Sequence, residues 1–207
     1  MKDILITPTY FPSIAQYIAL VNTKNATLEV CENYQKQSFR NSTFINTDQG
    51  KATLTVPVIY SQKKGHILTK NIEIANEENW QKQHLKTLET AYNSSPFFEF
   101  YIDDLTPIFT EKFDNLLTLN LKTIAIINTL IELETTISKT KEYEMNPKAT
   151  DLRFLANRRK AKTYAFDKYT QVFGSEFEAN LSVLDLLFME GPNALLYLER
   201  QIRKFLF

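Results

Sequence analysis

The residues best suited to chemistry lie between Asn33 and Asn41, where amides, cations and aromatic rings follow one another without a regular period. Arg40 can bind a phosphate or carboxylate through two parallel hydrogen bonds, and Lys36 adds a compact point charge. The amides of Asn33 and Asn41 suit hydroxyl and carbonyl groups. A strand facing a core would alternate apolar and polar side chains, which this segment does not. We therefore expect it to bind an oxygen-rich, anionic ligand, although a solvated loop with two ordinary cations explains the same residues.

A second candidate is the segment 8–16, where an expected strand ends and an expected helix begins. Tyr10, Ser13 and Gln16 are its polar side chains, and two prolines stiffen the loop that carries them. Ligands of open α/β sheets bind at the carboxyl ends of strands, and a helix N-terminus attracts anions. The segment is expected to border a ligand. A stiff connector whose aromatic rings pack in the core is an equally good explanation.

The third candidate is the expected helix that begins near Trp80. On a helix Trp80, His84 and Leu88 lie on one face. His84 could act as a general base or acid, because the pKa of an unperturbed histidine lies near neutrality. A half-buried structural histidine is the alternative. His66 follows two lysines in an expected turn and should be exposed to solvent.

Two further features have ordinary structural explanations. Asp185 lies in an apolar run, and Ser182 three residues before it predicts a capping box in which Asp185 serves the start of a helix. A carboxylate that orients a histidine or arginine is the alternative. A basic cluster could grip a nucleotide phosphate, but a solvated helix face explains it as well. The cluster consists of Arg153, Arg158, Arg159, Lys160 and Lys162.

The elements that must position these residues follow from the hydrophobic pattern. Apolar runs at 4–7 and 26–31 predict strands, and the period of apolar residues over 14–22 predicts a helix between them. Strand, helix and strand at this spacing form a right-handed parallel unit. The turn 48–50 between the runs 44–45 and 53–59 predicts a hairpin, whose second strand Pro57 places at a sheet edge. A short strand follows at 72–74.

After residue 76 the pattern becomes mainly helical. Helices are expected at 79–92, from 96 behind a cap at Ser95, at 113–134, at 177–189 and at 193–206. The polar stretch 132–148 is expected to be a surface connector. The predicted fold class is α/β, with a small mixed sheet in the N-terminal third and a predominantly helical remainder packed around it. We expect a single domain over 1–207, with an α/β part at 1–76 and a mainly helical part at 77–207.

Composition excludes several classes of function. Lysine plus arginine equal aspartate plus glutamate at 24 each, so we expect neither nucleic acid nor an anionic membrane as a partner. With 4 glycines there is no G-x-G-x-x-G and no Walker loop, and 2 histidines with 1 cysteine cannot build a typical zinc site, so no metal is expected. No signal-peptide region or bilayer-length apolar run is visible, so the cytoplasm is the expected compartment. The residues point to no particular cofactor.

The order of several motifs resembles one known family. Along the chain come P-T-Y-F-P-S-I-A-Q-Y, E-N-Y-Q-K-Q-S-F-R-N, L-T-V-P-V, W-Q-K-Q-H and A-Y-N-S-S-P-F-F. Each motif is weak alone, but their order resembles the WbqC-like protein family. The C-terminal Y-T-Q-V-F, N-L-S-V-L-D-L-L-F and G-P-N-A-L resemble the branch of that family common in Bacteroidetes, so the resemblance runs from about residue 7 to about residue 197.

The resemblance implies a role in making or decorating sugar nucleotides for O-antigen-like surface polysaccharides, by formyl or aminoacyl transfer, but it supplies no catalytic residues. Our first hypothesis is a cytoplasmic transferase that moves an acyl, formyl or aminoacyl group to an amino-sugar nucleotide. Such a transfer needs an amine freed of its proton. His84 would be the base, and Lys36 with Arg40 would hold a diphosphate or the carboxylate of the donor. The remaining expected binding residues are Tyr10, Ser13, Gln16, Asn33, Asn41 and Trp80. Under this hypothesis the three candidate segments line one common cavity. The chain departs from the family pattern F/W-R-N-R at Ser42.

Two other interpretations stay open. A non-catalytic module, partnered by a polysaccharide biosynthetic enzyme or by a second copy of the chain, fits the 13% aromatic content and the sticky surface expected at 97–101 and 205–207. Nucleotidyl transfer is the weaker alternative. Ser13 and Gln16 stand where the phosphate-binding loop of such enzymes carries histidines.

Overall fold

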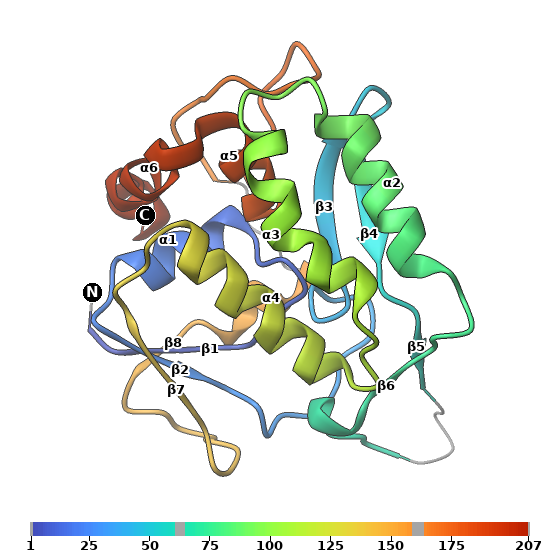
Figure 1. Ribbon diagram of the computed structural model, residues 1–207. Coiled ribbons are helices and arrows are strands. Elements are labelled where there is room, and N and C mark those ends of the chain that lie inside the picture. The colour runs from blue at the N-terminus through green and yellow to red at the C-terminus, as the bar shows by residue number, and fades with distance from the viewer. Residues whose placement is uncertain (1, 61–64, 159–163, 207) are drawn as a thin grey trace.

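A parallel β–α–β unit opens the fold, as the sequence predicts. The computed structural model describes residues 2–60, 65–158 and 164–206. β1 (Ile4–Ile6) is fully buried and pairs in parallel with β2 (Asn25–Leu28), and α1 (Ile14–Val21) connects them. Figure 1 shows this unit in blue, with α1 lying against the C-terminal helices. The α/β fold class is confirmed.

The main sheet has four parallel strands in the order β7-β2-β1-β8. β7 (Thr136–Lys139) extends the sheet beside β2, and β8 (Thr150–Asp151) extends it beside β1. The prediction of a surface connector over 132–148 is therefore wrong for β7. This strand is short, mostly exposed and rich in polar side chains, so its hydrophobic pattern carries little strand signal.

Two small antiparallel sheets lie apart from the parallel one. β3 (Ser42–Thr47) and β4 (Gly50–Thr55) form the predicted hairpin, which turns at Gly50 with a φ of 90°. β5 (Val58–Ile59) pairs with β6 (Glu73–Ile74). The predicted strand over 53–59 is interrupted at Pro57, because proline offers no N–H to continue a ladder. A 3₁₀ turn, Thr69–Asn71, precedes β6.

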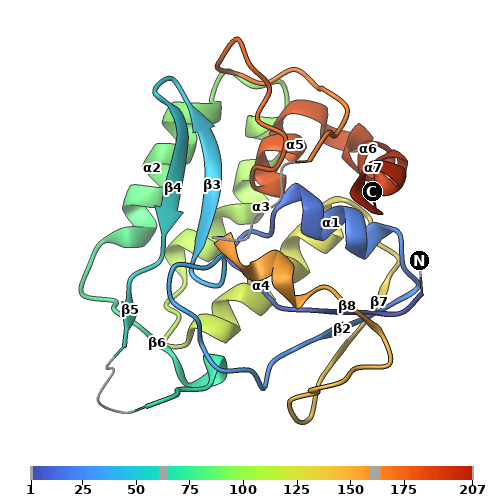
Figure 2. The ribbon, with the colours of Figure 1, turned by 180° about the vertical axis from the view of Figure 1, so that it is seen from behind.

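Three long helices follow. α2 (Trp80–Tyr92) matches its prediction, and Figure 2 shows it behind the hairpin β3–β4. α3 (Phe98–Thr110) begins later than predicted, because the Ser95 hydroxyl donates to the carbonyl of Tyr92 at 2.6 Å instead of capping α3. α4 (Leu116–Leu130) is shorter than the predicted 113–134, and the Asn115 side chain caps it by accepting from two backbone amides.

The C-terminal region packs on the N-terminal unit. It contains a 3₁₀ turn, Arg153–Ala156, then α5 (Val183–Glu190), a second 3₁₀ turn, Gly191–Asn193, α6 (Ala194–Arg200) and α7 (Ile202–Leu206). The amide of Ile14 donates to Leu181 at 2.9 Å, and that of Val183 donates to Pro12 at 2.9 Å. The predicted helix over 177–189 begins only at Val183, and the one over 193–206 is broken at Gln201, whose buried side chain binds Asp167.

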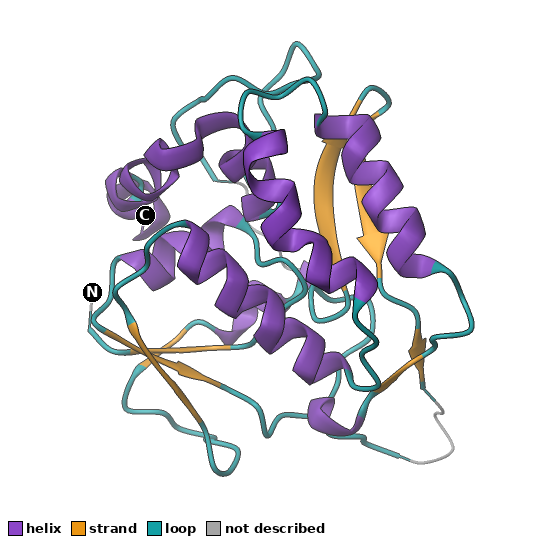
Figure 3. Ribbon diagram, in the orientation of Figure 1, coloured by secondary structure: helices purple, strands orange, loops and turns teal. Residues whose placement is uncertain are grey.

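The layers are clearest when helices and strands are coloured separately. Figure 3 shows the helices grouped to one side of the parallel sheet, with the hairpin β3–β4 between α3 and α2 in this view. Among the described residues, no helix combines the length and the apolar character that crossing a lipid bilayer requires.

Candidate functional site

The three segments singled out in the sequence meet in the core, where the backbone N–H of Tyr10 donates to the carbonyl of Phe39 at 3.1 Å and the Tyr10 ring contacts Trp80 and His84. The ring centroids of Tyr10 and Trp80 are 6.2 Å apart, those of Tyr10 and His84 are 5.7 Å apart, and those of Trp80 and His84 are 5.3 Å apart. Tyr10, Trp80 and His84 are 0%, 3% and 6% exposed. These three rings therefore fill the space between the loop after β1 and the helix α2, and they line none of the surface pockets that we describe below.

His84 is a neutral ring with both nitrogens engaged. The Tyr10 hydroxyl lies 3.0 Å from Nδ1, and the backbone of Thr55 accepts a hydrogen bond from the ring. Because a carbonyl only accepts, the proton belongs on Nε2, and Nδ1 accepts from Tyr10. Burial lowers the pKa of His84 to about 4, and the bond to Thr55 opposes this shift. The imidazole thus links the core to the strand β4 and stays uncharged at neutral pH.

Ser13 and Gln16 close the loop that starts α1. The Gln16 side chain accepts from the Thr9 hydroxyl at 2.6 Å and from the Ser13 amide at 3.3 Å, and it donates to the Thr7 carbonyl at 3.1 Å. The Ser13 hydroxyl caps the helix by accepting from the backbone N–H of Gln16 at 3.4 Å. Both side chains are buried. Their contacts match the stiff-connector explanation, and their predicted role in ligand binding stays a prediction.

Arg40 lies in the interior, paired with Glu32. Its Nε and Nη2 donate to the two carboxylate oxygens of Glu32, each at 2.7 Å, and the two side chains are 2% and 6% exposed. The predicted role of Arg40 in holding a diphosphate or a carboxylate stays a prediction, because its charge is already paired with Glu32. The third guanidinium nitrogen, Nη1, is also buried and has no hydrogen-bond partner among the described residues.

A pocket of about 350 Å³ opens beside this buried pair. We call it the basic pocket. The loop after β2 contributes Tyr34, Lys36, Gln37 and Asn41. The ends of the hairpin and the segment after it contribute Ser42, Thr55, Val58 and Tyr60, and Arg158 approaches from the 3₁₀ region before residue 159. Two predicted binding residues, Lys36 and Asn41, thus line one pocket together with a member of the basic cluster.

The described residues that line the basic pocket carry only positive charge. Lys36 and Arg158 are cations, and none of the described residues that line it carries a carboxylate. The Lys36 ammonium lies 4.4 Å from the centroid of the Tyr60 ring, and the Arg158 guanidinium lies 5.9 Å from that of Phe44. Both cations therefore rest on aromatic faces, which hold them without neutralising them.

The other side chains of the basic pocket are held by hydrogen bonds or stacking. Asn41 Nδ2 donates to the Val56 carbonyl at 2.9 Å, which fixes the direction of its amide. The rings of Tyr34 and Tyr60 are 5.6 Å apart. Burial raises the pKa of Tyr34 to about 12, so its hydroxyl keeps its proton and can donate. Gln37 adopts a positive φ of 53°, a costly conformation for a residue with a side chain.

Several other predicted residues lie elsewhere. Asn33 is exposed and pairs through its backbone with Leu68 instead of lining the basic pocket. Arg153 is held by Asp151 and Glu29, at 2.6 Å and 3.3 Å. Arg159, Lys160 and Lys162 lie outside the described residues. His66 is exposed, as predicted.

The capping-box prediction for Asp185 is wrong in one half. Ser182 does cap α5 by accepting from the Leu184 amide at 3.3 Å. The Asp185 carboxylate, however, accepts from the hydroxyls of Tyr92, at 2.8 Å, and of Tyr169, and from the Gln171 amide at 3.0 Å. Burial raises the pKa of Asp185, and these three hydrogen bonds oppose that shift. The carboxylate is fully buried and serves a network, not the helix start.

Two residues of the basic pocket carried little signal in the sequence. Thr55 and Tyr60 belong to a hairpin end and to the segment behind an edge strand, and only the folded chain brings them to the loop 34–41. Tyr34 lay within the predicted segment and could have been chosen as an aromatic between amides. In the described part of the chain, no group of three or more His, Cys, Asp or Glu residues is arranged to hold a metal ion.

Comparison with known proteins assigns the chain to a family. The model of the WbqC-like protein family matches residues 7–166. The chain belongs to the WbqC-like protein family. All residues of the basic pocket fall within the matched part, whereas α5, α6 and α7 follow it. No curated protein and no solved structure matches the chain.

Proposed function

We propose that this member of the WbqC-like family is a transferase of surface-polysaccharide biosynthesis that acts on a sugar nucleotide. The anionic part of that substrate lies in the basic pocket. Membership in the family supports a function related to polysaccharide biosynthesis. The reaction class that we propose is transfer of an acyl, formyl or aminoacyl group to an amino sugar.

One observation carries the proposal: two cations without a carboxylate among the described lining residues share a pocket with two tyrosines and two amides. A diphosphate supplies a negative charge that balances the cations Lys36 and Arg158. Guanidinium and ammonium groups are the usual partners of phosphate oxygens in proteins. Pockets of a few hundred Å³ with a few placed polar groups are typical of small-molecule sites.

The other residues have supporting roles. Asn41 presents its amide oxygen to a hydroxyl or N–H of the ligand, and the protonated Tyr34 hydroxyl donates to an oxygen. Thr55 forms part of the wall and is held from behind by His84. The role of His84 as the base stays a prediction: its ring is neutral, as a base must be, but Nδ1 faces Tyr10 and the residue is 6% exposed.

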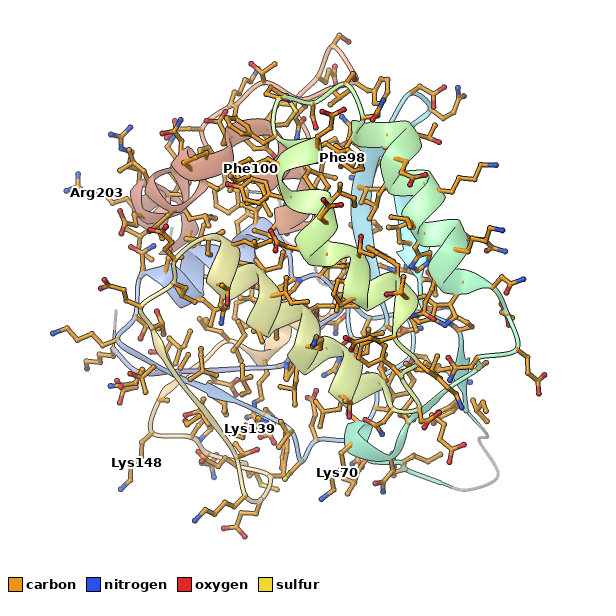
Figure 4. The ribbon with its side chains drawn as sticks, viewed as in Figure 1. Lys70, Phe98, Phe100, Lys139, Lys148 and Arg203 are labelled. Carbon is orange, nitrogen blue, oxygen red and sulfur yellow. The ribbon has the colours of Figure 1, made fainter. Side chains whose placement is uncertain are left out.

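A thermal-shift screen tests the proposal. Nucleotide sugars, free nucleotides, coenzyme A thioesters and folates are added to the full chain, and a ligand that prefers the native state raises the Tm. We expect nucleotide sugars to raise it, and the shift to fall in Lys36→Ala and in Arg158→Ala. Lys139→Ala is the matched control, because this exposed lysine lies on β7 (Figure 4) and outside the basic pocket.

Two outcomes would contradict the proposal. If no nucleotide or nucleotide sugar changes the Tm, the basic pocket does not hold such a substrate. If the shift is the same in Lys36→Ala, Arg158→Ala and Lys139→Ala, the ligand binds elsewhere on the protein.

The non-catalytic partner hypothesis is less well supported by the surface. Phe98 and Tyr101 are 3% and 4% exposed and belong to the core, whereas Phe100 is 71% exposed. The aromatic surface expected over 97–101 is thus reduced mainly to one ring. Co-purification with a biosynthetic enzyme, together with no binding of a sugar nucleotide by calorimetry, would favour this alternative.

A further inference from the structure

A second and larger hollow lies at the other end of the hairpin β3–β4. We call it the hairpin-tip groove; its volume is about 700 Å³. Thr47 and Asp48 form one side at the turn of the hairpin, Thr87 and Thr90 on α2 form another, and Phe173 approaches from the loop before α5. None of its residues belongs to the basic pocket. Along β3 the two sites are separated by five residues, or about 17 Å at the rise of a strand.

Phe173 is held at the groove by a chain of buried hydrogen bonds. Its carbonyl accepts from the side-chain Nδ2 of Asn46 at 2.6 Å, and the backbone N–H of Asn46 donates to the Tyr92 hydroxyl at 3.1 Å. That hydroxyl donates in turn to the buried Asp185 at 2.8 Å. A buried carboxylate is tolerated only when donors satisfy it, so this network makes the position of Phe173 rigid.

A second set of bonds fixes the loop that carries the ring. The Gln171 side chain donates to the Glu178 carbonyl at 3.1 Å and accepts from the Glu178 amide at 3.0 Å. The Glu178 carboxylate pairs with Lys51 of β4 at 2.7 Å. The loop is thereby tied both to itself and to the hairpin, which places an aromatic ring beside the polar wall of the groove.

The polar groups of the groove include both acceptors and donors, since Gln83 and Lys86 line it together with Asp48 and the threonines. The hydroxyls of Thr87 and Thr90 donate to backbone carbonyls of their own helix, at 2.8 Å and 2.9 Å, so their lone pairs remain for a ligand. Asp48 adds carboxylate oxygens. The formal charge is balanced, because Asp48 and Lys86 are the charged residues among those that line it. A ligand without net charge and rich in hydroxyls, which both donate and accept hydrogen bonds, suits this arrangement.

We propose that the hairpin-tip groove binds a neutral carbohydrate, with the C–H face of one sugar ring packed on Phe173 and its hydroxyls donating to Asp48, Thr87 and Thr90. The apolar ring face and the polar ring edge of a sugar match an aromatic wall and a polar wall. The volume accommodates a disaccharide, within the range of known ligand pockets. This site is independent of the proposed anion site in the basic pocket.

The test is a titration of the ¹⁵N-labelled full chain with maltose, cellobiose and N,N′-diacetylchitobiose, followed by two-dimensional NMR. We expect at least one of these sugars to shift the amides of Thr47, Asp48 and Thr87 with a millimolar Kd. Phe173→Leu keeps an apolar side chain but removes the flat face, and should weaken that Kd by about tenfold. Thr90→Val, which replaces a hydroxyl with a methyl group, should weaken it by about fivefold.

Phe100→Leu is the matched control, because Figure 4 places this exposed ring on α3 and it lines neither site. Its Kd should equal that of the wild type. The proposal is overturned if none of the three sugars shifts the groove amides, or if Phe173→Leu and Thr90→Val bind as the wild type does. If the sugars instead shift the amides of Lys36 and Thr55, the carbohydrate binds in the basic pocket. This result would overturn the proposal of binding in the hairpin-tip groove and would favour the proposed function.

Discussion

The buried ion pair of Arg40 and Glu32 gives the sharpest prediction. Arg40→Met keeps the length of the side chain and removes both charge-assisted hydrogen bonds, each 2.7 Å long. Glu32, 6% exposed, would then be a buried carboxylate without its cation. Removing one partner of such a pair costs about 3–5 kcal/mol. The third nitrogen, Nη1, has no hydrogen-bond partner among the described residues and adds nothing to this cost. We therefore expect the free energy of unfolding to fall by about 4 kcal/mol.

Urea unfolding followed by tryptophan fluorescence measures this loss. Trp80 is the only tryptophan in the chain and is 3% exposed, so its emission reports on the core beside the loop of Tyr10. With an m-value of about 2 kcal/mol/M, the midpoint should fall by about 2 M. Lys36→Met in the same loop is the control, because this side chain is exposed and should change stability by less than about 0.5 kcal/mol.

A double substitution separates the pair from the site. Glu32→Met combined with Arg40→Met replaces both charges with apolar groups of similar size, so most of the lost stability should return. The reasoning is refuted if Arg40→Met lowers stability by less than about 1 kcal/mol while it abolishes the thermal shift of a nucleotide sugar. Arg40 would then contact the ligand, as the residue types in the sequence suggested.

Three further predictions concern other buried groups. Burial lowers the pKa of His84 from 6.5 to about 4, so between these two pH values the unfolded state binds a proton that the folded state does not. The free energy of unfolding should therefore fall by about 3 kcal/mol as the pH drops from 6.5 to 4. His84→Gln should remove most of this fall in a profile of the urea midpoint against pH. Tyr92→Phe removes the hydroxyl between Asn46 and Asp185 and should cost about 2 kcal/mol in the same assay, whereas an unchanged midpoint would mean that the network contributes no stability. Gly191→Ala places a Cβ 2.6 Å from the ring of Phe97 at a φ of 52°, and should lower the Tm measured by calorimetry through a loss of about 1–3 kcal/mol.

Local signals explain which parts of the fold could be predicted. The unit of β1, α1 and β2 and the hairpin β3–β4 are encoded by apolar runs and a turn within short stretches of sequence. β7 and β8 lack such signals. They count as strands because their backbones pair with β2 and β1, more than a hundred residues earlier in the chain. A short exposed edge strand is defined by its neighbour more than by its own side chains.

Burial explains why the site could be predicted only in part. Residue types pointed to the segment 33–41, and two of its predicted binding residues, Lys36 and Asn41, line the basic pocket. They could not show that Arg40 is paired with Glu32 eight residues earlier, because residue types identify hydrogen-bond donors but not the partners that these donors have in the fold. Ser13 and Gln16 did carry a usable signal, since S-x-x-Q is a capping-box pattern. Tyr60 and Arg158 reach the basic pocket from separate elements, which only the tertiary structure brings together.

Two buried polar groups, His84 and Asp185, support the hairpin β3–β4 from within the core. His84 binds the backbone of Thr55 from behind the basic pocket, and Asp185 holds Tyr92 and thereby Asn46 behind the hairpin-tip groove. Each lies in the core, each has its pKa shifted by burial toward the neutral form, and each ties the hairpin β3–β4 to a helix. Burying such groups opposes folding, so a simple core would favour apolar residues at these positions. This cost in folding free energy is explained if the hairpin must be rigid. Its open end, Ser42 and Thr55, forms one wall of the basic pocket, and its turn, Thr47 and Asp48, forms one wall of the hairpin-tip groove.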